Sequence, residues 1–492
     1  MAASERLNIL LIVNDQHRYD TLGCYGAPIC RTPHIDALAA RGVRFDAAYT
    51  PTSPCSPARA ALFTGLYPHK NHVLYNGLVL NPEVPNLASE LQKASYNLGY
   101  AGKWHVDRAH VPSEYGFEGK DFPGYGYPPG GGVIEGLRFG GARREPIPHY
   151  PEYLKAHGYE PPKVLEAFYG DNAGKLNQEM YALQSGSLET TFEYMVSEFA
   201  IELLRKFQGD YEREGKPFFL CVNFWGPHTP CLLPEEYYYM YPPEDIPEEP
   251  SFTETWDRKP RVQELYERFW GLSSGGWRSW REIIARYWGY VTMLDHLAGR
   301  IIDELEALGL AKNTVVIFTT DHGDMMGAHR LIEKGPFMYE QCYRLPLVIA
   351  HPACEAPGSV CEEFVYLHDL YPTFLEIAGL EPPAVPDSQS ILENILGRPT
   401  PTGRESVYSV FHRQIFSFEQ RMVRTRRYKF VFNASDFGEL YDLQNDPWEM
   451  RNIADLPETK EIQEELMEMM RAHMVRLGDP LLREFDRIRY VY

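Results

Sequence analysis

Residues 314–320 read TVVIFTT, and Asp321-His322-Gly323-Asp324 follow at once. The run is too short to cross a membrane and too uniformly apolar for a strand with one face in water. It therefore predicts a strand buried on both faces of a mainly parallel sheet. Because ligands bind at the carboxyl ends of the strands in open α/β sheets, the polar residues behind it are expected in a ligand site.

Three further short apolar runs fit the same description. They are Asn8–Val13 (NILLIV), Pro217–Val222 (PFFLCV) and Leu345–Ala350 (LPLVIA). Polar clusters follow the first two as well, at Asn14–His17 and Asn223–His228. Apolar residues recur at helical spacing over Val291–Leu308, and Gly309 follows as a stop, which predicts an amphipathic helix leading into the strand at Thr314. We expect helices to flank the sheet and three strand ends to meet at one crevice.

The C-terminal part of the chain has a different pattern. Gln420–Phe432 (QRMVRTRRYKFVF) alternates as a strand does, and Glu458–Leu477 has helical periodicity. We therefore predict a catalytic α/β domain over residues 1–375 and a smaller α+β domain over residues 376–492.

Composition excludes several classes of function. Of the 492 residues, 48 are Lys or Arg and 68 are Asp or Glu, which gives a formal net charge of −20 and argues against nucleic acids and anionic membranes as partners. The 8 cysteines show no Cys-x-x-Cys spacing, so neither a disulfide scaffold nor a zinc ribbon is expected. Met1–Leu7 lacks the features of a signal peptide and no apolar run is long enough for a transmembrane helix, so we expect a cytoplasmic protein.

The chemical core is Pro54-Cys55-Ser56-Pro57-Ala58-Arg59, followed by Thr64-Gly65. The spacing between Cys55 and Arg59 is too short for the phosphate-binding loop of cysteine phosphatases. An isolated cysteine at the start of a helix is most often a packing residue. However, Cys-x-Pro-x-Arg with the downstream Thr-Gly resembles the modification motif of the formylglycine-dependent type I sulfatases, in the alkaline phosphatase superfamily, whose cysteine is oxidised to formylglycine.

Further motifs follow in the order and at the spacing of that family, over most of the chain. They are Gly102-Lys103-Trp104-His105, Gly226-Pro227-His228, Asp321-His322-Gly323, Lys334 and Arg344-Leu345-Pro346-Leu347. The resemblance implies a large central, mostly parallel mixed sheet flanked by helices. It also implies a smaller C-terminal domain with its own short antiparallel sheet.

The resemblance implies a particular chemistry at residue 55. A sulfate monoester repels nucleophiles and has a poor leaving group, so its hydrolysis needs positive charge, a strong nucleophile and a proton donor. One hydroxyl of the hydrated aldehyde attacks sulfur, and deprotonation of the second expels sulfate by C–O cleavage and regenerates the aldehyde. A formylglycine-generating maturation enzyme is therefore an implied partner.

The resemblance also implies a metal site. Asp15, Asp321 and His322 would join the formylglycine at Cys55 around a divalent cation, for which Ca²⁺ fits best and Mg²⁺ or Mn²⁺ are alternatives. Many sulfatases carry two consecutive aspartates where this chain has Asn14-Asp15. Asn14 is then either a carbonyl-oxygen ligand or no ligand, and the lost negative charge should weaken the site or shift its metal preference.

The remaining family positions would bind sulfate and move protons. Arg59, Lys103 and Lys334 form the implied sulfate clamp, and Arg59 also holds the formylglycine hydroxyl. His105 would assist the hydroxyl during sulfate release. His228 would face the leaving-group oxygen as general acid, with Lys334 sharing that role.

Other candidates rest on the residues alone. His17 and His329 either line the substrate pocket or are hydrogen-bonded loop histidines. Gly271–Gly275 matches Gly-x-Ser-x-Gly, but no strand precedes it, so we read it as a chance match. The region from His110 to Met195 is expected to supply substrate-contacting loops. Its residues Tyr125, Tyr127, Arg138, Arg143 and Arg144 would suit a sugar or aryl group with further negative charge, although each alone also fits a solvated loop.

Three functions stay open at this point. The first is hydrolysis of a small sulfate monoester, a sulfated sugar by preference or an aryl or alkyl sulfate. The second is a phosphonate monoester or phosphodiester hydrolase with the same formylglycine chemistry; Asn14-Asp15 and Pro54 resemble that group, whereas Gly102–His105 favours the sulfatases. The third is a catalytically silent anion-binding protein. Relatives of this kind are often dimers or tetramers, which allows a homo-oligomer.

Overall fold

A computed structural model describes residues 6–122, 134–135, 149–168, 180–272, 275–383, 387–398 and 400–489. Some sequence-predicted candidates lie outside the described residues. These are Tyr125, Tyr127, Arg138, Arg143 and Arg144 of the middle region and Ser273 and Ser274 of the Gly-x-Ser-x-Gly match.

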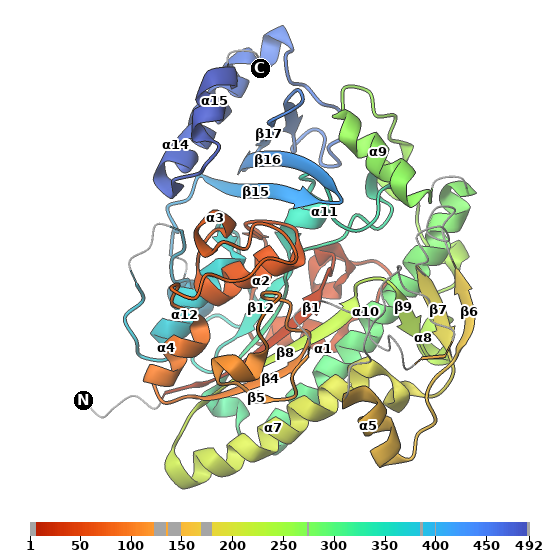
Figure 1. Ribbon diagram of the computed structural model, residues 1–492, viewed down its shortest axis with the longest axis vertical. Helices are drawn as coiled ribbons and strands as arrows, with labels where there is room; N and C mark the ends of the chain where they lie inside the picture. Colours follow the sequence, from red (N-terminus) through yellow and green to blue (C-terminus); the bar gives the residue numbers. More distant parts are fainter. Residues whose placement is uncertain are drawn as a thin grey trace.

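The central sheet has eight strands in the order β13-β2-β12-β10-β1-β8-β4-β5 (Figure 1). Strand β1 (Asn8–Asp15) lies between β10 (Thr314–Thr320) and β8 (Phe218–Pro227) and is parallel to both. Strand β4 (Asn97–Gly102) adds in parallel to β8, and β12 (Leu347–Ala350) pairs antiparallel with β10. The predicted mostly parallel mixed sheet is confirmed.

The remaining strands of that sheet are short, and two three-stranded sheets accompany it. These strands are β2 (Val43–Phe45), β5 (Glu118–Gly119) and β13 (Ser359–Cys361), then β3 (Ala48–Tyr49), β11 (Arg344–Leu345) and β14 (Val365–Tyr366), then β6 (Val164–Phe168), β7 (Tyr181–Gln184) and β9 (Cys231–Leu233). The predicted run Leu345–Ala350 is divided between β11 and β12 because Pro346 has no N–H to donate to a ladder.

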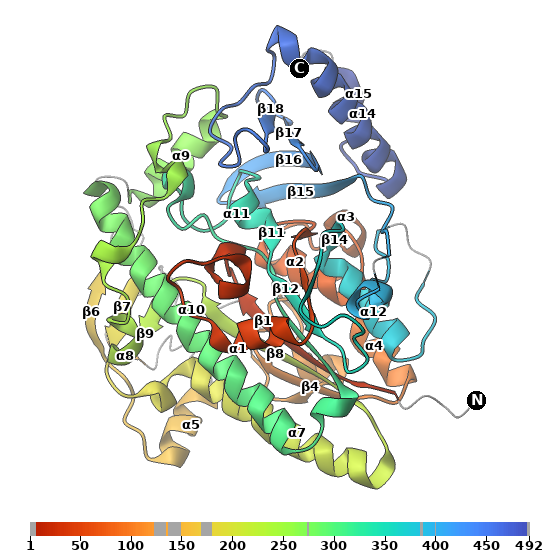
Figure 2. The ribbon, with the colours of Figure 1, turned by 180° about the vertical axis from the view of Figure 1, so that it is seen from behind.

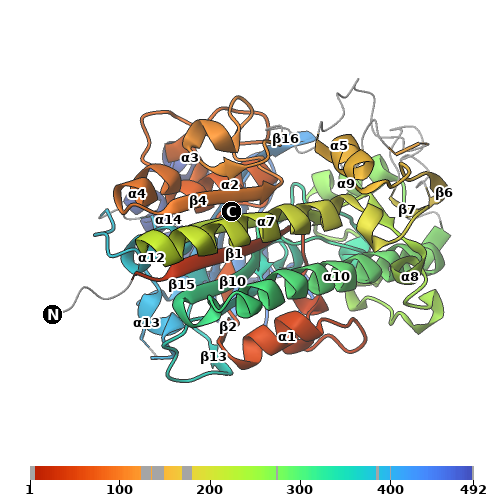
Figure 3. The same cartoon turned by 90° about the horizontal axis from the view of Figure 1, so that it is seen from below.

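Helices cover both faces of the sheet, which explains why β1 is apolar throughout. Leu10 and Ile12 pack with α1 (Pro33–Ala40), α7 (Phe192–Glu214) and α10 (Gly276–Ala307). Ile9, Leu11 and Val13 pack on the other face with α2 (Cys55–Thr64), α4 (Leu87–Lys93) and α12 (Leu370–Ile377). Figure 3, seen from below, shows α7, α10 and α1 side by side as the first of these two layers. The predicted helix Val291–Leu308 is the C-terminal half of α10.

A second, four-stranded antiparallel sheet follows in the C-terminal part, where α14 (Lys460–Leu477) packs against it (Figures 1 and 2). Its strands are β15 (Ser406–Gln414), β16 (Phe416–Thr425), β17 (Tyr428–Asn433) and β18 (Glu439–Asp442). The predicted small antiparallel sheet and the predicted helix are confirmed. The division at residue 375 stays a prediction; this residue lies within α12.

One expectation for this part was wrong. Gln420–Phe432 is the end of one strand and most of the next, because the chain turns at Arg426 and Arg427. The Tyr428 N–H donates to Thr425 Oγ1 across this turn at 3.0 Å. Alternation of apolar residues continues through the turn, so the pattern alone hides it.

Shorter helices complete the described chain. They are α3 (Pro68–Asn71), α5 (His149–His157), α8 (Glu235–Tyr238), α9 (Arg261–Trp270), α11 (Glu340–Tyr343), α13 (Leu392–Ile395) and α15 (Leu482–Ile488). None of the helices in the described ranges has the length and apolar character needed to cross a membrane.

A glycine fixes the end of β4 beside the end of β8. Gly102 has a φ of 97°, and a Cβ atom there would lie 1.9 Å from the carbonyl oxygen of Asn223. The N–H of Lys103 donates to that same carbonyl at 2.9 Å. Close backbone approach at Gly102 is therefore what places Lys103 at the carboxyl ends of the strands.

We expect Gly102→Ala to lower both thermal stability and turnover, because the new methyl group must push the Asn223 carbonyl and Lys103 apart. Gly309→Ala is the matched control: Gly309 also has a positive φ, of 72°, but nothing lies within 4 Å of a Cβ there. The control should cost only about 1 kcal/mol, the strain of the left-handed backbone. Equal melting temperatures for the two variants would contradict this account.

Candidate active site

Cys55 is the first residue of α2, and the sequence around it fixes where this helix begins. Pro54 is extended, with φ −68° and ψ 140°, and Pro57 occupies the first turn, where a missing N–H leaves no helical hydrogen bond unmade. Gly65, in the left-handed conformation, ends the helix. The Ser56 N–H donates to Asn76 Oδ1 at 3.0 Å, which ties the loop at Asn76 to the start of the helix.

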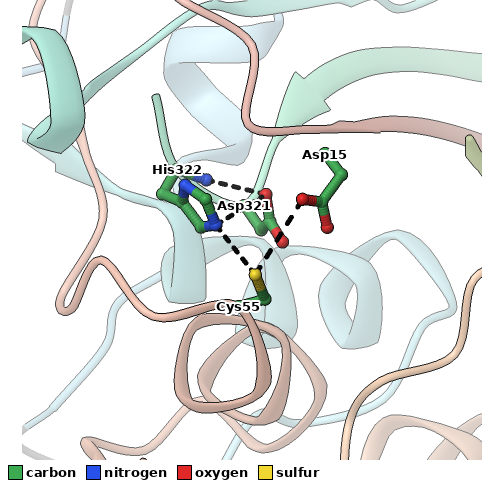
Figure 4. Close-up of side chains that lie close together, drawn as sticks. All are labelled: Asp15, Cys55, Asp321 and His322. Carbon is green, nitrogen blue, oxygen red and sulfur yellow. Dashed lines mark hydrogen bonds and ion pairs between the residues drawn. The ribbon is translucent and has the colours of Figure 1, made fainter. Parts of the chain in front are cut away.

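Asp15, Cys55, Asp321 and His322 form one buried cluster (Figure 4). Their ligand-type atoms all lie within 4.8 Å of one another. Cys55 Sγ is 3.1 Å from His322 Nε2 and 3.9 Å from Asp15 Oδ1. The ends of β1 and β10 and the start of α2 thus meet at one point, as the strand pattern predicts.

The cluster fits a divalent cation. The His322 Nδ1–H donates to the Gly323 carbonyl at 2.8 Å, so Nε2 is the ring nitrogen that faces the cluster. Two carboxylates and this imidazole are donors that hard or borderline divalent cations accept. Asn14 Nδ2 donates to His17 Nδ1 at 2.8 Å, whereas Asn14 Oδ1 is buried with no partner among the described residues. Its carbonyl oxygen therefore remains available to a cation.

Arg59 forms ion pairs with both carboxylates of the cluster. Its Nε lies 2.8 Å from Asp321 Oδ2, and its Nη2 lies 2.9 Å from Asp15 Oδ2. Its third nitrogen, Nη1, donates to Asn223 Oδ1 at 2.8 Å. All three nitrogens of the guanidinium contact acceptors at the ends of three neighbouring strands, so Arg59 fixes the relative positions of these strand ends.

Two buried lysines complete the positive charge. Lys103 Nζ lies 2.6 Å from Asp15 Oδ2 and 4.2 Å from the centre of the Trp225 ring. Lys334 Nζ lies 2.6 Å from Gln16 Oε1 and 2.8 Å from His228 Nε2. The structure thus brings all three residues of the predicted sulfate clamp to the cluster.

The charges of the site shift the pKa values of its acids. Burial raises the pKa of Asp15, but Lys103 and Arg59 outweigh burial and hold this pKa well below its usual range. Burial and the charge of Asp15 raise the pKa of Asp321. Burial would also raise the pKa of the Cys55 thiol, but Lys334, Lys103 and His322 lower it well below its usual value. The site therefore stabilises negative charge at residue 55.

The two predicted proton-transfer histidines lie at the most accessible edge of the site. His105 and His228 are 7% and 9% exposed, whereas the other predicted site residues are at most 4% exposed. Burial lowers the pKa of His105 to about 4, so this histidine is neutral at pH 7. The His228 Nδ1–H donates to the Thr229 carbonyl at 2.7 Å, which leaves Nε2 to accept from Lys334.

His17 and His329 are hydrogen-bonded loop histidines, the second of the two sequence readings. His17 accepts from Asn14 and contacts Thr21 Oγ1 through Nε2 at 2.9 Å. His329 Nδ1 lies 2.7 Å from Glu254 Oε2, and its ring stacks on Tyr339 with 3.9 Å between centroids.

Sequence reasoning assigned no role to several residues that build the site. Gln16 is fully buried with a φ of 65° and bridges Lys334 and Asp324. Its place in the polar segment after β1 was the available signal, and the same holds for Asn223 and Trp225 after β8. Glu193 gave no signal, because a charged residue in an amphipathic helix is normally solvent-facing.

A mixed α/β sheet whose strand ends carry carboxylates, lysines and an arginine around a nucleophile position defines an enzyme acting on anionic esters. The family model for sulfatases matches residues 7–380, and that for the C-terminal region of N-sulphoglucosamine sulphohydrolase matches residues 327–476. The chain belongs to the sulfatase family, and it is a sulfate ester hydrolase.

Individual relatives agree with this assignment. An uncharacterized sulfatase of Escherichia coli strain K12, YidJ, is 28% identical over 485 residues, which cover 97% of this chain and 88% of that protein. An arylsulfatase of Clostridium perfringens is 28% identical over 477 residues, with 92% and 91% covered. The phosphonate monoester hydrolase of Agrobacterium radiobacter superposes with a TM-score of 0.77 at 26% identity, with 95% and 96% covered.

Glu193 of α7 holds the end of β8 in place. Its Oε1 accepts from the Gly226 N–H at 3.0 Å and from the Tyr290 hydroxyl at 2.8 Å. Its Oε2 accepts from the Trp225 N–H at 3.3 Å. Burial raises the pKa of Glu193 from 4.5 to about 7, although these three donors oppose the shift.

This shift makes a pH-dependent contribution to stability. The folded state binds the Glu193 proton more tightly than the unfolded state, so the contribution is complete below pH 4.5 and is lost as the pH rises through 7. Between about pH 5 and pH 8, the loss of this proton should decrease the free energy of unfolding of the wild type by on the order of 3 kcal/mol. We expect Glu193→Gln to abolish this decrease. Urea unfolding of wild type and variant at both pH values measures the difference. Glu202→Gln, an exposed position on the same helix, should leave the wild-type pH dependence intact; a Glu193→Gln profile parallel to wild type would contradict the assignment.

Proposed function

We propose that this protein is a type I sulfatase that hydrolyses a small sulfate monoester after Cys55 has been converted to formylglycine. One observation carries the proposal. Cys55 stands at the start of α2, in contact with Asp15 and His322, where Lys103 and Lys334 stabilise negative charge on it. The sulfatase modification motif surrounds this residue, and an unmodified packing cysteine would not need two buried lysines beside it.

The hydrated aldehyde would supply one hydroxyl that attacks sulfur and a second through which sulfate leaves. Asp15, Asp321 and His322, with Asn14 Oδ1 as a further donor, would hold a divalent cation, Ca²⁺ by preference or Mg²⁺ or Mn²⁺, which supplies positive charge for ionising the attacking hydroxyl. Arg59 keeps both carboxylates in place for this role through its two ion pairs.

Lys103 and Lys334 would bind the sulfate oxygens. Both ammonium groups are almost fully buried, and in such low-dielectric surroundings a fixed charge stabilises an anion more than it does in water. Burial would lower the pKa of Lys334, but Cys55 and Glu333 raise it above its usual value, so Lys334 stays protonated.

His228 and Lys334 would deliver the proton to the leaving alcohol. Because the His228 Nδ1–H donates to the Thr229 carbonyl, Nε2 accepts a hydrogen bond from Lys334 across 2.8 Å. Lys334 is thus the protonated member of the pair, and Nε2 is the atom through which its proton would reach the leaving alcohol. His105 is neutral at pH 7 and would accept the proton of the second hydroxyl as sulfate departs.

A phosphonate monoester or phosphodiester hydrolase is the second candidate. The superposition on the Agrobacterium radiobacter phosphonate monoester hydrolase and the single acidic residue in Asn14-Asp15 favour it. Lys103, held between Asp15 and the Trp225 ring in a motif of sulfatase type, favours the sulfatase.

The modification of Cys55 is the first test. Coexpression with a formylglycine-generating enzyme should yield a peptide around residue 55 with the mass of the aldehyde or its hydrate in place of the thiol. Cys55→Ala should reduce turnover by more than about a thousandfold, because the nucleophile is gone. An unmodified thiol in active protein, with a control substrate of the maturation enzyme fully converted, would overturn the formylglycine proposal.

The second test separates the two candidate reactions. With the converted protein we expect kcat/KM for 4-nitrophenyl sulfate to exceed that for 4-nitrophenyl phenylphosphonate by at least about tenfold, since Gly102–His105 is a motif of sulfatase type. Both esters release the same chromophore, so one assay measures both rates. A preference for the phosphonate would establish the second candidate instead.

A further inference from the structure

Strand β15, which leads to the tip of the β15–β16 hairpin (Arg413–Phe416), lies above α2 in Figures 1 and 2 and contacts the segment that precedes this helix, although it belongs to the C-terminal sheet. Ser409 Oγ donates to the Thr50 carbonyl at 2.8 Å, and the Val410 N–H donates to the Pro51 carbonyl at 2.8 Å. The residue numbers of the two segments increase together from the first contact to the second. Strand β15 therefore runs in the same direction as the segment that leads to Cys55. The strand therefore carries its last residues toward the active site.

Two separate sets of contacts connect the tip to the site. On one side, the Arg413 guanidinium lies 5.5 Å from the centre of the Tyr75 ring, and Asn76 Oδ1 accepts from the Ser56 N–H. Residue 413 is thereby linked to the residue that follows Cys55.

On the other side, the Phe416 ring lies 6.2 Å from the Tyr266 ring. The Tyr266 hydroxyl donates to the Lys334 carbonyl at 2.6 Å. The tip thus reaches both the Cys55 side and the Lys334 side of the site, which places it at the rim.

Arg413 is one of several exposed arginines of this acidic chain that have no ion pair among the described residues. The protein has 68 acidic and 48 basic residues, yet Arg413 is exposed and forms no ion pair with any residue that the structure describes. The carboxylate of Glu419, on the same hairpin, contacts His412 and Arg421 instead. Within the described ranges the Tyr75 hydroxyl is likewise without a hydrogen bond, and Gln414 Oε1 is buried without a partner.

We propose that Arg413, supported on the Tyr75 ring, binds a second anionic group on the alcohol portion of the substrate. A guanidinium fork matches a carboxylate or a sulfate, and a tyrosine face packs against a sugar ring. The inference rests on the proposed sulfatase function and narrows it: the substrate is a sulfated sugar that carries either a carboxylate or a second sulfate.

Matched pairs of esters test the subsite and distinguish its two ligands. The carboxylate pair is a sulfated glucuronic acid and its methyl ester; the second-sulfate pair is glucosamine with N- and 6-O-sulfates and N-acetylglucosamine 6-sulfate. Wild type should prefer the anionic member of one pair by at least about tenfold in kcat/KM, mainly through KM. The pair that shows this preference identifies the group. Arg413→Met should abolish the preference, and Arg413→Lys should retain part of it.

Arg426→Met is the matched control. Arg426 is also exposed and stacks on an aromatic ring, that of Phe364 at 4.4 Å, but it lies at the opposite end of β16. This variant should keep the full preference, and all variants should melt with wild type. Turnover without preference in either pair, or a preference that survives Arg413→Met, would overturn the subsite and leave the proposed function standing. No turnover of any ester by protein with a verified aldehyde would instead overturn the proposed function.

Discussion

The buried guanidinium of Arg59, paired with Asp15 and Asp321, is the interaction on which the site depends. A buried carboxylate is costly unless it is paired and hydrogen-bonded, and here two of them lie at the ends of adjacent parallel strands. Arg59 compensates both and takes its third contact from Asn223 on the strand next to β1. Arg59 thus holds the two carboxylates in fixed positions at the ends of the strands.

This arrangement is asymmetric. Of the two carboxylates, only that of Asp15 forms an ion pair with Lys103, and this pair helps to keep Asp15 ionised. Burial and the negative charge of Asp15 raise the pKa of Asp321 and so favour its protonation. Two carboxylates that one guanidinium cannot fully neutralise are what a divalent cation would stabilise. The neutral amide of Asn14, in place of a further carboxylate, keeps the negative charge of the cluster low, so the surrounding lysines can still attract an anionic ester.

Features of the fold and the site that follow from local sequence patterns could be predicted, whereas contacts between segments far apart in the sequence could not. The strands were predictable because β1, β8 and β10 are buried on both faces, and the meeting of Asp15, Asp321 and His322 followed from the parallel direction of the strands. The residues Lys103 and Lys334 came only from the resemblance, since an isolated lysine has no local signature. The contacts of Glu193 with Trp225 and Gly226 join distant segments, and no local pattern contains them.

The same reasoning applies to the C-terminal part of the chain. The alternating pattern over Gln420–Phe432 predicts that this part of the chain belongs to a sheet, but not that the sheet contacts the segment before Cys55. Contacts between distant segments place it there, among them those that β15 makes with the backbone carbonyls of Thr50 and Pro51, more than three hundred residues away in sequence. Because these carbonyls lie just before the nucleophile position, any shift of the C-terminal sheet would move both the hairpin tip and the approach to residue 55. The cluster around Cys55 is therefore positioned by the central sheet, whereas the proposed binding site for the rest of the substrate would be positioned by the C-terminal sheet.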